Sequence, residues 1–261
     1  MANQIVLTAW DGFLTALKED VSLPQMMASL KKRGVPVIGF TERDRAELEP
    51  IRQQLNWIDP FITESGSGIF TPVAHNPFSP ALGEQDGDYY VAELGCPYVQ
   101  ARAGLRVLAN LIGHPLKGFG DFTVPQLQKF LGVSESAAHQ AKAREFSELF
   151  MTPKAVESAA LIEAAEEMGF GIIVRNPEES RFSELIGADA GLAAAVGQVI
   201  AAYQSRLPSG ETLRVLSLNS REDEVTMQTE LPTEFTGLID WQGLTVSAPT
   251  DWTAGVENWL K

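Results

Sequence analysis

Short apolar segments that alternate with helical patterns constrain this chain more than any other feature of its sequence. Residues 5–10 (IVLTAW) are almost continuously apolar and end at Asp11-Gly12, a pair that favours turns. A short apolar run that ends in a turn is typical of a buried strand in a parallel sheet. Residues 35–40 and 60–63 repeat the pattern, with helical segments between the runs. This strand–helix–strand order predicts a parallel sheet with crossover helices.

The pattern is interrupted in the middle of the chain and then resumes. Residues 71–88 are rich in Pro, Gly, Asn and Asp, and the segment up to about residue 185 mixes strands and helices in a looser order. An alanine-rich helix over 188–204 and a buried strand over 212–218 (TLRVLSL) then return to the first pattern. The interruption indicates a second domain inserted into the first.

We therefore expect an α/β fold, in which a doubly wound parallel sheet carries an inserted α+β cap domain. The predicted core takes residues 1–85 and 187–261, and the predicted cap takes residues 86–186. In sheets of this kind, ligands bind beyond the carboxyl ends of the strands. The candidate site therefore lies after the core strands.

Charge and composition exclude several classes of protein. The 34 acidic and 20 basic residues give a net charge of −14, which argues against a nucleic-acid partner because phosphate binding needs a basic surface. The single cysteine, Cys96, excludes an internal disulfide framework, and the three histidines show no ligand spacing. No apolar run is long enough for a membrane span, and the N-terminus does not resemble a secretory signal, so we expect a cytoplasmic protein.

Three motifs in the middle segment resemble one family. Residues 93–98 (ELGCPY) with Arg102, residues 118–123 (GFGDFT) and residues 143–150 (AREFSELF) follow in the order of the mannosyl-3-phosphoglycerate phosphatases. That family lies within the haloacid dehalogenase superfamily. The resemblance extends over nearly the whole chain and implies a haloacid dehalogenase-like core with a cap.

The resemblance also implies roles for particular residues. Residues 40–45 (FTERDR) are similar to the family's second motif, centred on Thr41, and residues 64–68 (ESGSG) to a glycine loop. The implied ligand-binding residues are Glu64, Gly66, Arg102, Asp121, Arg144 and Arg181. Paired arginines suit phosphate and carboxylate groups because the guanidinium fork binds them through two hydrogen bonds. Alternatives remain open: Thr41 as a helix cap, Asp121 as a turn residue, and the arginines in ion pairs with acidic residues.

The catalytic motif departs from the family at the end of the first predicted strand. The family's nucleophilic aspartate corresponds to Ala9, while its second aspartate, the general acid/base, is kept as Asp11. Phe13 stands where a small hydroxyl residue is expected. If Asp11 were the nucleophile, Phe13 would take the acid/base position, so a shifted alignment does not restore the site. Asp11 is equally well explained as a turn residue before Gly12.

Two further positions lack the family's charged groups. The lysine position corresponds to Ala190, and the first acid of the metal motif corresponds to Asn219. Asp223 remains as a weak candidate metal ligand, although a run such as 222–224 (EDE) is most often a solvated acidic turn. Magnesium is held by oxygens, usually carboxylates with waters and substrate phosphate, so these residues predict a poor magnesium site. We therefore expect no cofactor.

The leading hypothesis is a catalytically inactive relative of the phosphatases that binds a phosphorylated sugar or acid, or a protein partner. Trp10 and Phe13 favour the partner, because they are expected to make the rim of the site apolar. The alternative is a weak or altered Mg²⁺-dependent phosphatase, a phosphoric monoester hydrolase that uses Asp11 and Asp223. No Gly-x-Ser-x-Gly or Cys–His pattern supports a hydrolase with another nucleophile.

Overall fold

The large sheet of the protein is built from strands at both ends of the chain. The computed structural model describes residues 3–10, 13–14, 22–75, 77–174, 181–219, 237–246 and 248–261. The strands of the large sheet are β1 (Gln4–Ala9), β2 (Val37–Phe40), β3 (Phe61–Thr63), β4 (Gly68–Pro72), β5 (Glu84–Asp86), β6 (Tyr89–Glu93), β10 (Leu213–Asn219) and β11 (Ile239–Thr245). Within the described residues their order is β11-β10-β1-β2-β3-β4-β6-β5.

Most of this sheet is parallel. Strands β11, β10, β1, β2 and β3 pair in parallel, while β4, β6 and β5 continue the sheet in antiparallel pairs. The parallel part comes from the apolar runs that the sequence identifies as buried strands. The predicted α/β class with a mostly parallel central sheet is confirmed.

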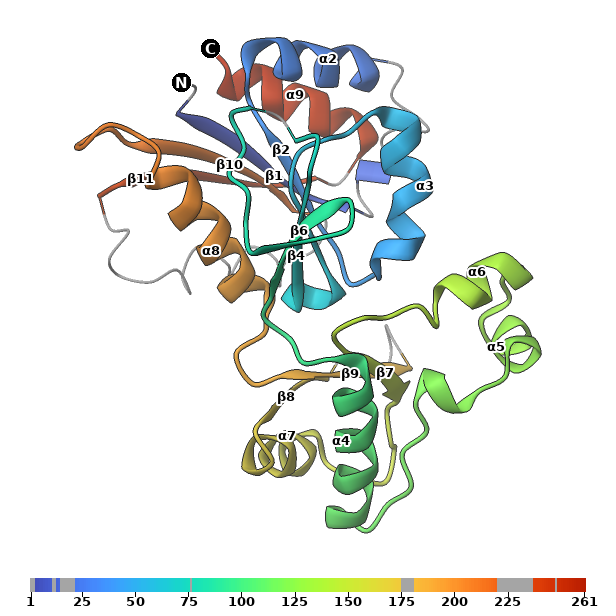
Figure 1. The fold of residues 1–261 in the computed structure, drawn as a ribbon. Coiled ribbons are helices and arrows are strands. Elements are labelled where there is room, and N and C mark those ends of the chain that lie inside the picture. Colours follow the sequence, from blue (N-terminus) through green and yellow to red (C-terminus); the bar gives the residue numbers. More distant parts are fainter. Residues whose placement is uncertain are drawn as a thin grey trace.

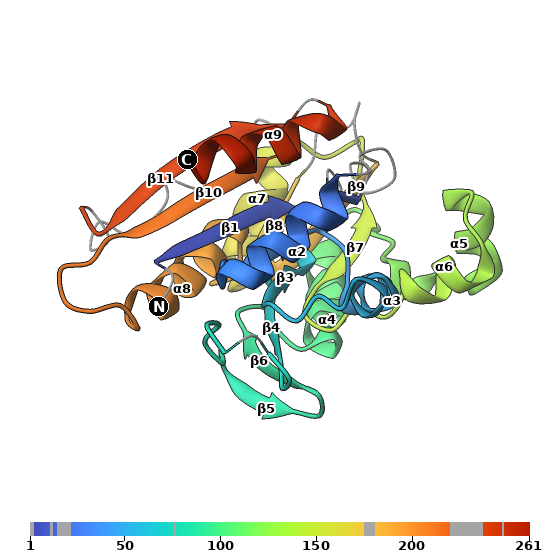
Figure 2. The same ribbon diagram turned by 90° about the horizontal axis from the view of Figure 1, so that it is seen from above.

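Helices cover both faces of the large sheet (Figure 1). Helices α2 (Leu23–Arg33), α3 (Arg45–Leu55) and α9 (Pro249–Trp259) supply one apolar cluster, and α8 (Leu192–Gln204) supplies the other. Successive side chains of β1 alternate between the faces: Val6 joins the first cluster, and Ile5 and Leu7 join the second. Figure 2 shows α2 and α9 together on the first face. In the described part of the chain, none of the helices has the length and apolar character needed to cross a membrane.

A smaller body below the core contains the second sheet (Figure 1). Its strands β7 (Glu148–Met151), β8 (Phe170–Ile173) and β9 (Phe182–Gly187) are antiparallel, in the order β7-β9-β8. Its helices are α4 (Tyr98–Leu111), α5 (Val124–Leu131), α6 (Glu135–Gln140) and α7 (Ser158–Glu167). Side chains of α4 and α7 pack with Phe150 and Leu185 of this sheet. We call this body the cap.

The strand β6 differs from the sequence-based division at residue 86. It pairs with β4 in the large sheet, where Val91 lies opposite Phe70. Tyr89 at its start packs edge-on against Phe61 and Phe70, with ring centroids 5.8 and 5.7 Å away. These contacts attach β6 to the core, although the sequence pattern assigns it to the cap. The rest of the division into domains stays a prediction.

Trp10 and Phe13 belong to the core rather than to the rim of the site. Both are buried, and the Trp10 ring stacks on Trp57 at a centroid distance of 4.5 Å. Phe13 meets the edges of Trp57 and Trp252 at 5.0 and 5.3 Å. Gly39 leaves room for this packing, since a Cβ there would lie 2.5 Å from the Trp10 ring. The expectation that these two side chains make the rim apolar is therefore wrong.

Trp252 joins the last helix to the first strand, so its truncation tests the packing of the core. Its indole N–H donates to the Thr8 hydroxyl at 2.9 Å, and its side chain is 1% exposed. We expect Trp252→Ala to lower the free energy of unfolding by about 3–5 kcal/mol, measured by urea denaturation. Leu111→Ala, at a 57% exposed position on α4, is the control and should cost less than about 0.5 kcal/mol. If the two variants lost equal free energy of unfolding, the role of Trp252 in the packing of the core would be contradicted.

Candidate ligand site at the junction of core and cap

The carboxyl ends of the parallel strands gather several of the predicted site residues. Ala9 ends β1 and lies opposite Phe40, which ends β2 just before Thr41. Glu64 follows β3, and Asn219 ends β10. Because these strands are parallel neighbours, their ends lie along one edge of the sheet, where such folds bind ligands.

The positions expected to carry the nucleophile and the lysine lie in one apolar cluster. Ala9 is 4% exposed and is part of the cluster between the sheet and α8, and the partly buried Ala190 packs against the same cluster. Asn219 is also buried, and its Oδ1 accepts a hydrogen bond from the Ser217 hydroxyl at 2.7 Å. In the described residues, this part of the edge therefore presents methyl groups and an amide whose oxygen is already bonded.

Two loops approach each other closely beside this cluster. The turn η1 (Glu64–Gly66) has three consecutive residues with positive φ, of which Gly66 has φ 93°. A Cβ at Gly66 would overlap with the carbonyl carbon of Gly191, which precedes α8. Glu64 (φ 49°) and Ser65 (φ 55°) hold the same conformation at a steric cost, so the surrounding contacts must stabilise it.

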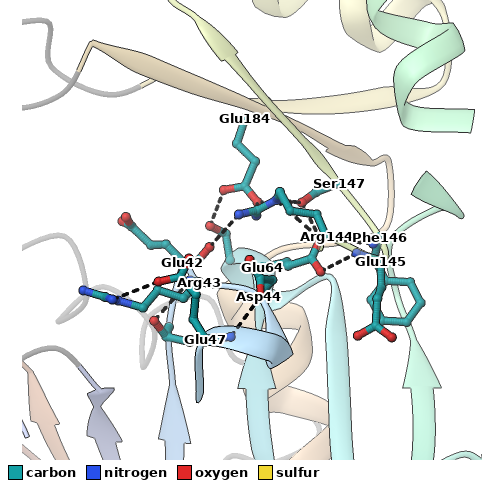
Figure 3. A network of polar contacts seen from close by, with 12 residues as sticks. Glu42, Arg43, Asp44, Glu47, Glu64, Arg144, Glu145, Phe146, Ser147 and Glu184 are labelled. Carbon is teal, nitrogen blue, oxygen red and sulfur yellow. Dashed lines mark hydrogen bonds and ion pairs between the residues drawn. The ribbon is translucent and has the colours of Figure 1, made fainter. Parts of the chain in front are cut away.

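Glu64 supplies contacts between the core and the cap (Figure 3). Its carboxylate accepts hydrogen bonds from the backbone N–H groups of Glu145 at 2.7 Å and Phe146 at 3.0 Å. It also contacts the Ser147 hydroxyl at 2.6 Å. Burial of the carboxyl group raises the pKa of Glu64, although these hydrogen bonds and Arg144 oppose the shift. The predicted ligand residue Glu64 is therefore engaged by the chain itself.

Arg144 is buried in the same place, with a side chain that is 2% exposed. Its guanidinium pairs with Glu184 of β9 and lies 3.6 Å from the Glu64 carboxylate. It also donates to the Ser147 hydroxyl at 2.9 Å and to the Glu42 carbonyl at 3.2 Å. Burial disfavours the charged guanidinium, but the attraction of Glu184 and Glu64 outweighs it and raises the pKa of Arg144. The implied ligand contact of Arg144 stays a prediction.

A second buried carboxyl group borders Arg144 on the core side. Asp44 caps α3 by accepting from the Glu47 N–H at 3.1 Å, and its other oxygen is buried without a hydrogen bond. Burial and the nearby Glu47 raise the pKa of Asp44 to about 7, with Arg144 opposing the shift. The junction thus concentrates carboxyl groups around one guanidinium.

An ion pair at the surface joins the same two bodies. Arg45 of α3 binds Glu145 through two hydrogen bonds of 3.0 and 2.8 Å, and both side chains are about one third exposed. A third contact runs from the Gln140 side chain to the Ala46 carbonyl at 3.3 Å. The connection between core and cap therefore includes polar contacts both in its buried part and at the surface.

Arg102 and Asp121 form the more accessible pair of the cap. The Arg102 guanidinium binds the Asp121 carboxylate, and the two side chains are 26% and 34% exposed. The other Asp121 oxygen accepts from the Gly118 N–H at 3.1 Å and so fixes the turn of the GFGDF segment. Glu148 lies beneath, accepts from the Gly120 N–H at 2.9 Å, and has a pKa raised by burial. Lys142 holds the turn from the other side through the carbonyls of Phe119 and Phe122.

Thr41 and Arg181 are the other predicted site residues that the structure describes. Thr41 lies beside the η1 turn, because its carbonyl accepts from the Ser65 N–H at 3.1 Å. The Thr41 hydroxyl accepts from the Arg43 N–H at 3.2 Å, as expected for a turn residue. Arg181 lies over the Phe130 ring, 4.9 Å from its centroid, within the cap. Asp11 and Asp223 lie outside the described residues. Roles for all four as catalytic, metal or ligand residues stay predictions.

Sequence reasoning missed Ser147, Glu184 and Asp44, although each carries the junction. Glu184 has a sequence signal, because it is a charged residue within the short strand segment FSELIG. Ser147 stands inside the AREFSELF motif, where the resemblance singles out only the arginine. Asp44 lies within the FTERDR segment, whose sequence does not indicate that its side chain is buried.

The described residues do not by themselves fit a magnesium ion. In the ranges given above, no group of three or more His, Cys, Asp and Glu side chains is arranged to hold a metal. Asn219 offers an amide oxygen that already accepts the Ser217 hydroxyl. We therefore assign no chemical step to a metal ion.

Comparison with known proteins identifies the relatives of the chain. It is 29% identical over 230 residues to a glucosyl-3-phosphoglycerate/mannosyl-3-phosphoglycerate phosphatase from Persephonella marina, covering 87% of this chain and 82% of that protein. It is 37% identical over 123 residues to a mannosyl-3-phosphoglycerate phosphatase from Pyrococcus horikoshii, covering 47% and 49% of the two chains. No protein-family model matches the chain.

Solved structures support the fold. A phosphatase of the haloacid dehalogenase superfamily from Bacteroides thetaiotaomicron aligns with a TM-score of 0.61 and 14% identity, covering 99% of this chain and 96% of that one. At this identity the likeness shows the fold alone. The resemblance inferred from the motifs is confirmed: the curated homologues are mannosyl-3-phosphoglycerate phosphatases, and the structural neighbours belong to the haloacid dehalogenase superfamily.

The raised pKa of Asp44 predicts a pH dependence of stability. The folded protein holds a proton that the unfolded chain releases, so this stabilisation is present at low pH and is lost as pH rises toward about 7. We expect Asp44→Asn, which keeps the cap of α3, to remove a slope of up to about 1.4 kcal/mol per pH unit. Urea denaturation between about pH 5 and about pH 8 measures it.

The control for that experiment is Glu84→Gln on the exposed strand β5, which removes the same charge from the surface. It should keep the wild-type profile. If the free energy of unfolding of Asp44→Asn changed with pH as steeply as that of the wild type, the raised pKa of Asp44 would be contradicted.

Proposed function

We propose that this chain binds a phosphorylated sugar or sugar acid between the core edge and the cap, without hydrolysing it. The class of ligand is supported by the curated homologues, whose names describe phosphatases of glucosyl- and mannosyl-3-phosphoglycerate. The absence of hydrolysis is supported by the residues at the edge of the sheet. A protein ligand is the other partner that the sequence leaves open.

The observation that carries the proposal is the shared apolar cluster of Ala9 and Ala190. The resemblance places a carboxylate nucleophile and a lysine at these positions. An aspartyl-phosphate cannot form without the carboxylate, because alanine offers no nucleophile. Loss of both groups leaves no unpaired buried charge, whereas loss of one would leave the other uncompensated. The two alanines are thus consistent with a site that has adapted to the absence of phosphoryl transfer.

Arg102 is the candidate anion contact on the cap side. Its guanidinium is part-exposed, whereas that of Arg144 is buried between carboxylates. The Asp121 carboxylate orients it, and the GFGDF turn is fixed by the bonds to Glu148 and Lys142. A pre-oriented guanidinium binds a phosphate or carboxylate with less loss of side-chain entropy than a free one.

The absence of hydrolysis is tested directly. We expect the wild-type protein not to hydrolyse p-nitrophenyl phosphate or mannosyl-3-phosphoglycerate in excess Mg²⁺. The triple variant Ala9→Asp/Ala190→Lys/Asn219→Asp restores the groups that the resemblance requires. Its rate should exceed that of the wild type at least about a hundredfold, the lower end of what one positioned acid–base group contributes. Phosphate release measures both.

The matched control is the same triple variant with Asp11→Asn, which should lose the gained activity. Wild-type turnover that disappears in the single variant Asp11→Asn would overturn the proposal in favour of the alternative, a Mg²⁺-dependent phosphatase.

Binding without catalysis is tested by thermal shift. A ligand at about 100 times its dissociation constant adds about 2.7 kcal/mol to the free energy of unfolding. We expect mannosyl-3-phosphoglycerate to give a shift that Arg102→Ala reduces. Arg106→Ala changes an exposed arginine on the same helix, and it should keep the wild-type shift. No shift with a panel of phosphorylated sugars and acids would contradict a small ligand and favour a protein partner.

A further inference from the structure

The Ser147 hydroxyl stands between two buried carboxyl groups. Its Oγ lies 2.6 Å from Glu64 Oε2 and 2.9 Å from Glu184 Oε1 (Figure 3). The same oxygen accepts a hydrogen bond from Arg144 Nε at 2.9 Å. Ser147, Glu64 and Glu184 are all fully buried. All three partners therefore meet one hydroxyl group in a place that bulk water does not reach.

The number of protons in this arrangement is constrained by chemistry. A serine hydroxyl donates one hydrogen and accepts through two lone pairs. The Arg144 N–H brings its own hydrogen, so Ser147 can donate to only one of the two carboxylates. If both carboxylates were charged, the carboxylate that receives no hydrogen from Ser147 would face the Ser147 oxygen with a lone pair on each side of the contact, which is repulsive. The contact becomes a hydrogen bond only if that carboxyl group carries a proton and donates it to Ser147.

We propose that Glu64 holds a proton at neutral pH and donates it to the Ser147 hydroxyl, which donates in turn to Glu184, and that docking of the cap on the core depends on this proton. The proton stays on Glu64 while the two bodies are docked. Opening of the junction releases the proton to water.

Charge balance supports this arrangement. A second carboxylate in a buried site raises the pKa of the first. Burial raises the pKa of Glu64 in agreement with this. Arg144 pairs with Glu184, whereas its Nε lies 3.6 Å from the Glu64 carboxylate. Among the described residues, the titratable groups that act on this cluster include Asp44 and Glu47 on α3 and the Cys96 thiol before α4.

The pair lies across the junction, which couples the proton to the cap. Glu64 follows β3 of the core, while Ser147 and Arg144 lie in the segment that enters β7. Glu184 belongs to β9 of the cap and also accepts from the Ser65 hydroxyl of the core at 2.6 Å. When Glu64 loses its proton, its contact with the Ser147 hydroxyl, which joins the two bodies, becomes repulsive. The docked state is therefore favoured at low pH and weakens as pH rises.

Infrared spectroscopy tests the proton itself. The measurement uses the full chain with Asp44→Asn, because Asp44 lies beside this cluster and its pKa is also raised. Glu148 of the cap is another buried carboxyl group with a raised pKa, and it is present in every variant, so its absorption cancels in the difference between variants. We expect absorption of a protonated carboxyl group at neutral pH that is lost on Glu64→Gln. It should also be lost on Glu184→Gln, because Glu64 is then the carboxyl group closest to Arg144 among the described residues and ionises to balance its charge. The control Glu145→Gln, at the part-exposed pair with Arg45, should retain the absorption.

Hydrogen exchange in the same Asp44→Asn background tests the coupling to the junction, because Asp44 would otherwise release a proton of its own on opening. The amides of Glu145 and Phe146 donate to Glu64, so their exchange reports its opening. Opening of the junction releases the proton that Glu64 holds in the docked state. The equilibrium constant for opening should therefore rise about tenfold per pH unit. This increase adds to the pH dependence of the intrinsic chemical exchange rate. Glu184→Gln should abolish this extra slope. Ser147→Ala removes the bridging hydroxyl and should speed exchange at both amides while strand β1 stays protected.

The outcomes are decisive in both directions. If the Asp44→Asn protein shows the same carboxyl absorption with and without Glu64→Gln, the proposed proton on Glu64 is contradicted. If exchange at the Glu145 and Phe146 amides changes with pH only as the intrinsic chemical rate does, the proposed coupling between the proton and docking is contradicted. If Glu64→Gln fails to fold, the infrared comparison rests on Glu184→Gln and Ser147→Ala. Retention of the absorption in Glu184→Gln, or an unshifted band in Ser147→Ala, then overturns the proposal.

Discussion

The placement of the cap on the core depends on one buried guanidinium group. Arg144 lies between Glu64 of the core and Glu184 of the cap, and it also donates to Ser147 and the Glu42 carbonyl. Removing a partner from such a buried set is strongly destabilising, because the charge that remains is uncompensated. The left-handed turn at Glu64 and Ser65 is fixed by the same contacts. Geometry at the ligand-facing edge is therefore tied to electrostatics at the junction.

The edge of the sheet and the cap differ in chemical character. On the core side, Ala9 and Ala190 are part of the apolar packing against α8. On the cap side, Arg102 and Asp121 form a part-exposed ion pair on a turn held by Lys142 and Glu148. In the proposed function, recognition of an anion falls to the cap, and the core supplies the scaffold.

Most of the fold can be predicted from the sequence, because the parallel strands are short apolar runs between helical segments. The family motifs can also be identified from the sequence, because each is a short continuous segment. The contacts of the junction cannot be predicted in this way, because the partners are far apart in the chain: Arg144 and Glu184 are separated by 40 residues, and Ser65 and Glu184 by 119. The strand β6 carries no local mark of which sheet it joins, and only its packing against Phe61 and Phe70 decides. Trp10 and Phe13 adjoin the edge in sequence, but stacking with Trp57 and Trp252 draws them into the core.

The bond between the Trp252 indole and the Thr8 hydroxyl closes a span of 244 residues, with the cap between its ends. During synthesis β1 leaves the ribosome with β2, yet its other neighbour, β10, follows only after the whole cap. The cap sheet β7-β9-β8 is complete before the large sheet can close. One edge of β1 and the apolar side chains of the core stay uncovered in that interval. A nascent chain of this architecture is most exposed to aggregation and to chaperones just before its C-terminal helix emerges.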